Sequence, residues 1–197
     1  MRNSEKWKVG YTIEFYPEEG KYHYSGHRNC KVAFGPEEIR KQGTVCPVCR
    51  RRMTEGVLFR LQQLSTRENS VGKKQNSHGL TWYVDGSKKQ PSYVKLVPLL
   101  EIVAESLSST TASMKVKTLY ETLCNSLESE IAVLLHTPIE KIASVGGGKV
   151  GEGVRKVRLG DIAIEPGFDG EYGKVAIWDQ EKEKLAQEEK KQLGLKF

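Results

Sequence analysis

The fold is decided by two stretches, Gly26-His-Arg-Asn-Cys30 and Cys46-Pro-Val-Cys49, with 15 residues between them. Two residues separate the His and Cys of the first pair, as they do the two Cys of the second. Both side chains of a pair can therefore reach one ion from a single tight turn. One imidazole and three thiolates form the closed tetrahedral shell that suits zinc. We predict that His27, Cys30, Cys46 and Cys49 bind one structural Zn²⁺ ion.

Two alternatives to this ligand set remain open from the sequence. His23 lies four residues before His27 and offers a substitute imidazole, and a site without metal would leave small buried thiols and a surface His. A zinc deaminase is excluded, because it needs a His-x-Glu motif and Asn29 stands where that Glu would be. The remaining cysteine, Cys124, falls on the apolar face of an expected helix and is interpreted as a core thiol.

Composition and charge narrow the class of protein. The chain has 197 residues, 38% of them hydrophobic and 28% charged, and its longest aliphatic run is too short to span a bilayer. The first residues lack the apolar segment of a secretion signal, so we expect a cytoplasmic protein that does not enter membranes. Residues 1–100 carry 18 Lys+Arg against 9 Asp+Glu, whereas residues 101–197 carry 13 against 16. This asymmetry indicates at least two functional regions.

Periodicity along the chain predicts an α+β protein. Its predicted parts are a small zinc-ribbon-like basic β domain (1–64), a polar linker or loop with room for a short strand at 82–84 (65–92), a helical domain (93–177) and a charged tail helix (178–197). Helices are expected at 36–42, 55–64, 99–107, 116–127 and 131–135. The helical domain is also expected to contain a glycine turn between two helices and a short hairpin with strands at 162–164 and 175–177.

Basic residues gather around the predicted metal site. Arginines occupy 50, 51 and 52 directly after Cys49, and Arg28 and Arg60 lie near in sequence. Because guanidinium forks match phosphate oxygens, we expect these five arginines to contact DNA or RNA, with tyrosines 22 and 24 placed to stack on unpaired bases. The alternative is a solvated basic face with tyrosines packing a small core.

A second basic feature is the run Gly146-Gly-Gly-Lys149, which joins two amphipathic segments. It lacks the first Gly and the Ser/Thr of a P-loop, so nucleotide binding through that motif is rejected. A helix-hairpin-helix would use Gly147, Gly148 and Lys149 to grip a phosphate, with Arg155 on the following helix. An ordinary helical hairpin, in which the glycines only permit close packing, fits the pattern equally well.

Six stretches taken together resemble the C-terminal half of the endonuclease Q family. They are Phe15-Tyr-Pro-Glu-Glu-Gly-Lys-Tyr-His23, Gly26-His-Arg-Asn-Cys30, Cys46-Pro-Val-Cys49, Thr54-Glu-Gly-Val-Leu58, Leu96-Val-Pro-Leu-Leu-Glu-Ile102 and Pro166-Gly-Phe-Asp-Gly-Glu-Tyr-Gly173. The resemblance implies a DNA repair nuclease, often labelled helicase-like, that cuts beside deaminated bases such as uracil and hypoxanthine and at abasic sites. It also implies that zinc-binding and helical domains hold the DNA while an N-terminal PHP-type phosphoesterase domain cuts it.

The sequence departs from that family in one respect: only four His occur, and no His-x-His pair precedes residue 23. We therefore expect a chain without catalytic residues, either part of a longer protein or a stand-alone relative, that works with a PHP-type domain in cis or in trans. The alternative is a protein–protein interaction module of a helicase- or nuclease-like protein. A hydrolase built on Asp161, Asp169 and Glu171 is disfavoured, because no base or nucleophile is arranged beside them. Glu165, Asp169 and Glu171 could bind a metal, but turn chemistry explains the Pro-Gly and Asp-Gly pairs around them without one.

Overall fold

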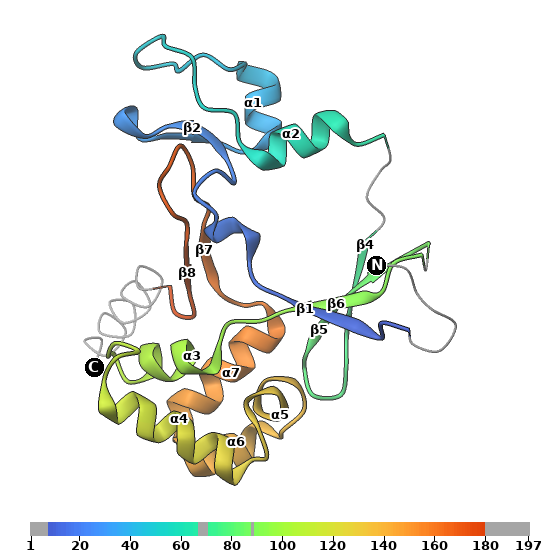
Figure 1. The fold of residues 1–197 in the computed structure, drawn as a ribbon, viewed down its shortest axis with the longest axis vertical. Coiled ribbons are helices and arrows are strands. Elements are labelled where there is room, and N and C mark those ends of the chain that lie inside the picture. The colour runs from blue at the N-terminus through green and yellow to red at the C-terminus, as the bar shows by residue number, and fades with distance from the viewer. Residues whose placement is uncertain (1–7, 67–70, 88, 180–197) are drawn as a thin grey trace, which may run out of the picture. The chain divides into compact units, whose positions relative to one another are not determined.

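The computed structural model describes residues 8–66, 71–87 and 89–179, which form an α+β fold (Figure 1). This confirms the fold class predicted from the sequence. The chain divides into two compact units. The first takes Met1–Val97 and Ile164–Val175, and the second takes Pro98–Ala163 and Ala176–Phe197.

The first unit contains a metal module, which we define as residues 17–64. Its elements are η1 (Pro17–Glu19), β2 (Ser25–His27), η2 (Arg28–Cys30), β3 (Val32–Phe34), α1 (Pro36–Gln42) and α2 (Val57–Leu64). Strands β2 and β3 pair antiparallel around η2. Helix α1 begins where expected, because the Glu38 carboxylate accepts the Gly35 N–H at 2.8 Å, and it ends at Gly43, whose φ of 78° favours glycine.

The same unit contains a four-stranded sheet with the order β1-β6-β5-β4. The strands are β1 (Tyr11–Glu14), β4 (Val71–Gln75), β5 (Thr81–Asp85) and β6 (Ser92–Lys95). The stretch 65–92, predicted to be a linker or loop with room for a strand at 82–84, contains a hairpin of β4 and β5, and the allowed strand lies within β5. All five residues of β4 are exposed, so this edge strand has no buried face and shows no apolar alternation.

The second unit is helical. Its helices are α3 (Leu99–Ser106), α4 (Met114–Ser126), α5 (Glu130–Leu135), α6 (Ile139–Gly146) and α7 (Gly148–Leu159). Each lies within a few residues of its predicted position. Their core consists of fully buried aliphatic side chains, among them Leu99, Ile102, Val103, Val116, Leu123, Val133, Ile142 and Val154. Among residues 8–66, 71–87 and 89–179, no helix is long and apolar enough to cross a bilayer.

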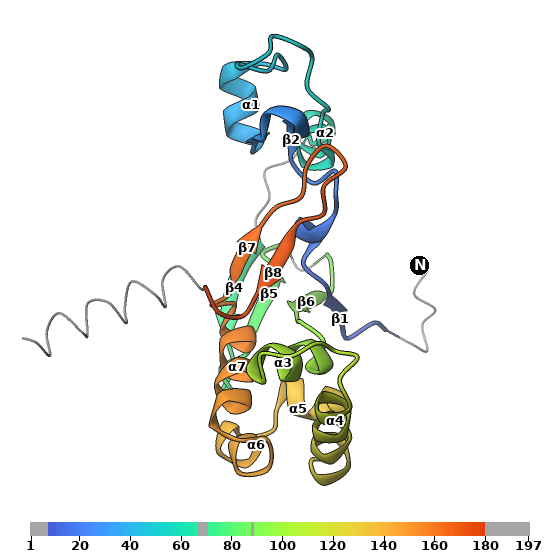
Figure 2. The ribbon, with the colours of Figure 1, turned by 90° about the vertical axis from the view of Figure 1, so that its left-hand side faces the viewer.

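A two-stranded hairpin follows α7. Its strands are β7 (Ala163–Glu165) and β8 (Lys174–Ala176), close to the predicted positions, and Figure 2 shows them side by side. The tip of this hairpin, residues 166–173, belongs to the first unit. The sequence predicts one continuous domain over 93–177 and does not reveal this return of the chain. Most of the predicted tail helix, residues 180–197, lies outside the described residues.

Candidate metal centre and nucleic-acid interface

The four predicted metal ligands come together in the metal module. The donor atoms of His27, Cys30, Cys46 and Cys49 all lie within 4.8 Å of one another. Nδ1 of His27 and Sγ of Cys49 are 3.5 Å apart, so the imidazole faces the sulfur atoms. One imidazole and three sulfurs at this spacing form a group that could bind a metal ion. In the described part of the chain it is the one group of this kind.

Tight turns position these ligands. The first turn is η2, which ends on Lys31 in the left-handed conformation, with φ of 51°. In the second turn, the Cys46 carbonyl accepts the Arg50 N–H at 2.9 Å, and the Cys46 N–H donates to the Arg51 carbonyl at 2.8 Å. Arg50 has a φ of 62°, so the chain reverses directly after Cys49. Both short ligand spacings thus produce compact turns, as the sequence suggested.

The surroundings shift the pKa values of the Cys46 and Cys30 thiols in opposite directions. Burial opposes ionisation of Cys46, but the N–H groups of Cys49 and Val48 outweigh it and lower the pKa of that thiol. Burial, together with the neighbouring Cys49 and Cys46 sulfurs, raises the pKa of Cys30 to about 11. A divalent cation would remove this difference, because it favours the thiolate of every ligand it binds.

The structure selects His27 over His23. His23 is not in the ligand group, and its ring stacks on Tyr24 with 5.4 Å between centroids. Burial lowers the pKa of His23, although the nearby Glu18 carboxylate opposes this shift. Cys124 lies beside Tyr120 in the helical unit and, as expected, outside the ligand group.

Asp169 connects the hairpin tip to the metal module. Its Oδ2 accepts the backbone N–H of Arg28 at 2.8 Å, and its Oδ1 accepts a short hydrogen bond from the Thr54 hydroxyl. Burial alone would raise the pKa of Asp169, but these two bonds and the charge of Arg28 lower it. Arg28 lies between His27 and Cys30, and Thr54, five residues after Cys49, pairs with Gly26 directly before His27. Asp169 therefore clamps both ligand-bearing segments.

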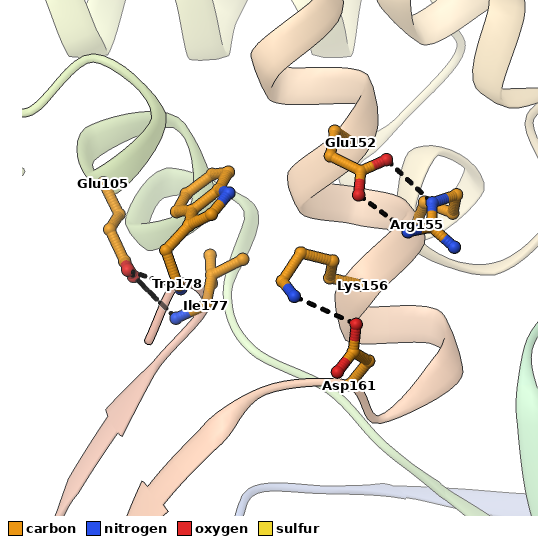
Figure 3. Close-up of polar contacts among 7 residues, drawn as sticks. All are labelled: Glu105, Glu152, Arg155, Lys156, Asp161, Ile177 and Trp178. Carbon is orange, nitrogen blue, oxygen red and sulfur yellow. Dashed lines mark hydrogen bonds and ion pairs between the residues drawn. The ribbon is translucent and has the colours of Figure 1, made fainter. Parts of the chain in front are cut away.

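The sequence pattern around Asp169 indicates only turn chemistry or a disfavoured catalytic acid. No local pattern reveals its role as a clamp, because its partners are 141 and 115 residues away. Asp161, of the same disfavoured hydrolase hypothesis, forms an ion pair with Lys156 at 3.0 Å (Figure 3).

The predicted DNA-contacting arginines of the metal module are all exposed. They are Arg28, Arg50, Arg51, Arg52 and Arg60. Two of them hold neighbouring side chains: Arg52 pairs with Glu55 at 2.8 Å, and Arg60 donates to Gln63 at 2.9 Å. Such exposed pairs are weak and exchange readily with a phosphate. The module therefore presents basic groups close to its ligand turns.

The glycines in and after the turn between α6 and α7 have different structural roles. Gly147 has a φ of 88°, which the turn between α6 and α7 requires. A Cβ at Gly151 would lie 3.0 Å from the Cβ of Ala143, so this glycine permits close packing of the two helices. A Cβ at Gly148 would meet open space. Packing therefore explains Gly151 but leaves Gly148 without a structural reason.

The basic side chains beside this turn have intramolecular partners. Arg155 forms a two-pronged ion pair with Glu152, with both distances 2.7 Å (Figure 3). The Lys149 ammonium lies 5.0 Å from the Trp178 ring centroid. Glu105 holds that C-terminal segment by accepting the N–H groups of Ile177 and Trp178 at 3.0 Å (Figure 3). Lys149 and Arg155 remain exposed, so both stay accessible to an anion.

Arg158 on the same helix has a different role from its neighbours. It is only 2% exposed and donates to the carbonyls of Leu134, Val133 and Thr137 at 2.7–3.0 Å. Burial lowers its pKa to about 10, which still leaves the guanidinium charged at neutral pH. A cation at the last carbonyls of α5 satisfies groups that the helix itself cannot pair. Nothing in the sequence pattern distinguishes Arg158 from the other basic residues of α7.

Comparison with known proteins relates the chain to a class of lesion-specific DNA endonucleases. A family model described as the MJ0043 C-terminal domain matches residues 98–161, nearly all of the helical stretch of the second unit. The crystal structure of the lesion-specific endonuclease PfuEndoQ from Pyrococcus furiosus is similar, with a TM-score of 0.64 and 29% identity over 85% of this chain. A crystal structure of endonuclease Q with a 27-mer duplex bearing an abasic lesion matches with a TM-score of 0.64 over 88% of it.

Among curated proteins, the uncharacterized protein MJ0043 of Methanocaldococcus jannaschii is 31% identical over 167 residues. The chain spans 19% of the length of that relative and 38–40% of the two endonuclease Q chains. The endonuclease Q matches cover 85–88% of this chain, so the structural likeness extends over both units but spans less than half of the lesion-specific endonuclease.

Proposed function

We propose that this chain is a zinc-stabilised, non-catalytic DNA-binding portion of an endonuclease-Q-like repair nuclease acting on deaminated or damaged DNA. The observation that carries the proposal is the likeness, at 29% identity and over 88% of this chain, to endonuclease Q in complex with lesion-bearing duplex DNA. The exposed arginines beside the ligand turns supply groups that match phosphate oxygens. In the helical unit, Gly147, Gly148, Lys149 and Arg155 would bind a second stretch of backbone.

We further propose that the metal is zinc. Three thiolates and one imidazole in a closed shell favour it over magnesium or calcium, which take oxygen ligands. Bound zinc would hold the two ligand turns together and leave no position for a reactive water. Reduced thiols also fit a cytoplasmic protein. Metal analysis of the protein after exhaustive dialysis should give one zinc per chain, and a folded protein without metal would refute the assignment.

DNA binding is tested with a charge-matched pair of variants. The variant Arg50→Ala/Arg52→Ala removes two charges beside the ligand turns, while Arg40→Ala/Lys41→Ala removes two from α1 of the same module. We expect the first to weaken duplex binding at all sequences and to reduce the salt slope, by about 1 for each arginine that binds a phosphate. The variant Arg40→Ala/Lys41→Ala should keep both the wild-type affinity and the wild-type salt slope. Equal effects of the two variants would show that only net charge matters.

Catalysis is assigned to a PHP-type domain acting in cis or in trans. The chain alone, incubated with magnesium or manganese and with uracil-containing or abasic duplex, should leave the DNA uncut. Nicking that survives repeated purification would contradict the non-catalytic role. If no salt-dependent DNA binding is seen at all, the alternative of a protein-interaction module is favoured.

A further inference from the structure

The tip of the β7–β8 hairpin presents an aromatic ring to solvent. Tyr172 is 72% exposed, although it lies in a loop whose neighbours are firmly attached. Exposure alone is common for apolar side chains, so what distinguishes Tyr172 is how its ring is held and what lies beside it.

The backbone on either side of Tyr172 is fixed to the metal module. Gly170 donates its N–H to the Lys21 carbonyl at 2.9 Å, and Gly173 donates to the Glu19 carbonyl at the same distance. Gly167 adds a third such bond, to Glu18 at 2.8 Å. The Asp169 carboxylate completes the attachment. A side chain on so constrained a backbone loses little conformational entropy when it binds, which favours its use in recognition.

One cation lies over the exposed ring, and a second reaches the hairpin tip. The Lys21 ammonium lies 5.0 Å from the Tyr172 ring centroid. A Cβ added at Gly170 would lie 3.4 Å from a guanidinium nitrogen of Arg28, so this arginine reaches the tip as well. Of the two acids at the tip, Asp169 is used in hydrogen bonds, and Glu171 is left exposed. An exposed aromatic ring with one cation over it and a second at the same tip matches a nucleobase attached to phosphates.

We propose that Tyr172, held by the Asp169 anchor beside Lys21 with Arg28 at the same hairpin tip, stacks on a base face that becomes exposed where DNA is distorted. This inference rests on the proposed DNA-binding function and adds a residue and a ligand chemistry to it. An intact duplex stacks its own bases and offers no free face. A duplex interrupted by an abasic site does, so the stacking favours damaged DNA.

The test compares three variants of the full chain on intact duplex and on duplex with one abasic site. Tyr172→Ala should lose about tenfold in affinity for the abasic duplex, the effect of one base–aromatic stack, and much less for the intact one. Tyr172→Phe keeps the ring and should bind as wild type. Phe15→Ala removes an aromatic side chain of matching exposure, 69%, elsewhere in the first unit and should change neither affinity. 2-Aminopurine beside the abasic site should be quenched by wild type but not by Tyr172→Ala.

The variant Asp169→Asn distinguishes the anchoring role of Asp169 from the effect of its negative charge on DNA binding. Removing a carboxylate strengthens DNA binding if electrostatics alone decides, whereas loss of the anchor should weaken binding to the abasic duplex. Zinc content is measured in parallel, so a damaged metal site is recognised, and Tyr172→Ala remains decisive in that case. If wild type binds both duplexes and Tyr172→Ala binds the abasic one equally well, the inference alone is wrong. If wild type binds no DNA, the proposed function fails with it.

Discussion

The metal module and the helical unit are held together in different ways. The buried hydrophobic core of the module consists of Ile39, Cys46 and Met53. Cys46 is also one of the four candidate metal ligands. The helical unit buries a long series of aliphatic side chains completely. A module of roughly fifty residues buries too little apolar surface to be stable without a metal or a similar crosslink. We therefore propose that a bound ion stabilises the module, whereas the helical unit depends on the hydrophobic effect.

Removing the metal should have the largest effect, because it should unfold the module and leave the helical unit folded. Cys46→Ser, or treatment with a strong chelator, should unfold the module, because structural zinc contributes about 10 kcal/mol or more to such sites. Hydrogen exchange should show loss of protection over residues 25–54, with α4 still protected. Retained protection in the metal-free module would contradict the dependence on an ion.

The largest effect within the helical unit is expected at Arg158. Arg158→Met leaves three buried carbonyls without their donor, each a loss of about 1 kcal/mol or more in unfolding free energy. We expect the helical unit to lose about 3 kcal/mol in denaturant unfolding, with zinc content unchanged. Arg155→Met serves as control, since it removes an exposed ion pair worth at most about 1 kcal/mol. Equal losses would mean that the buried hydrogen bonds of Arg158 add nothing.

The glycine turn allows a finer test. Gly151→Ala forces a Cβ against Ala143 and should cost about 1–3 kcal/mol of stability. Gly148→Ala meets open space at the start of a helix, so it should be neutral or stabilise by up to about 1 kcal/mol. If the turn grips a phosphate, Gly148→Ala should nevertheless weaken DNA binding. Unchanged binding in a stable Gly148→Ala variant would favour the purely structural hairpin.

The smallest effect concerns pH and the turn after β5. Asp85 accepts hydrogen bonds from the Ser87 hydroxyl and N–H, which lower its pKa to about 2. A lowered carboxyl pKa stabilises the fold above the unfolded value of about 3.9, and the contribution is lost as pH falls through about 2.

Metal ligands are protonated well before that point, because acid competes with zinc for thiolates and imidazole. During an acid titration followed by NMR, the signals of the metal module should therefore change before those of residues 85–90. Asp85→Asn should abolish the later transition and leave the earlier one. The reverse order would contradict the assignment of the module's stability to the metal.

Interactions between residues close in sequence could be predicted, and those between residues far apart along the chain could not. The candidate metal ligands come in pairs with two residues between their members, so spacing alone predicts the group that the structure brings together, and the helices of the second unit follow from apolar periodicity. The interactions of Asp169 and Arg158 could not be predicted, because a single carboxylate or guanidinium has no periodic signature. Strand β4 could not be predicted for a related reason: it is held by backbone hydrogen bonds and exposes every side chain, whereas β5 includes the strand allowed at 82–84.

The sequence by itself determined the α+β class, the spacing that predicts the metal ligands and the positions of the described helices, since each depends on residues within one or two turns of chain. Only the tertiary structure decided that the hairpin tip returns to the metal module, that Asp169 bonds to both Arg28 and Thr54, and that Tyr172 is left exposed with Lys21 over its ring. These features join segments more than a hundred residues apart. They arise from packing and hydrogen bonding that no local pattern encodes.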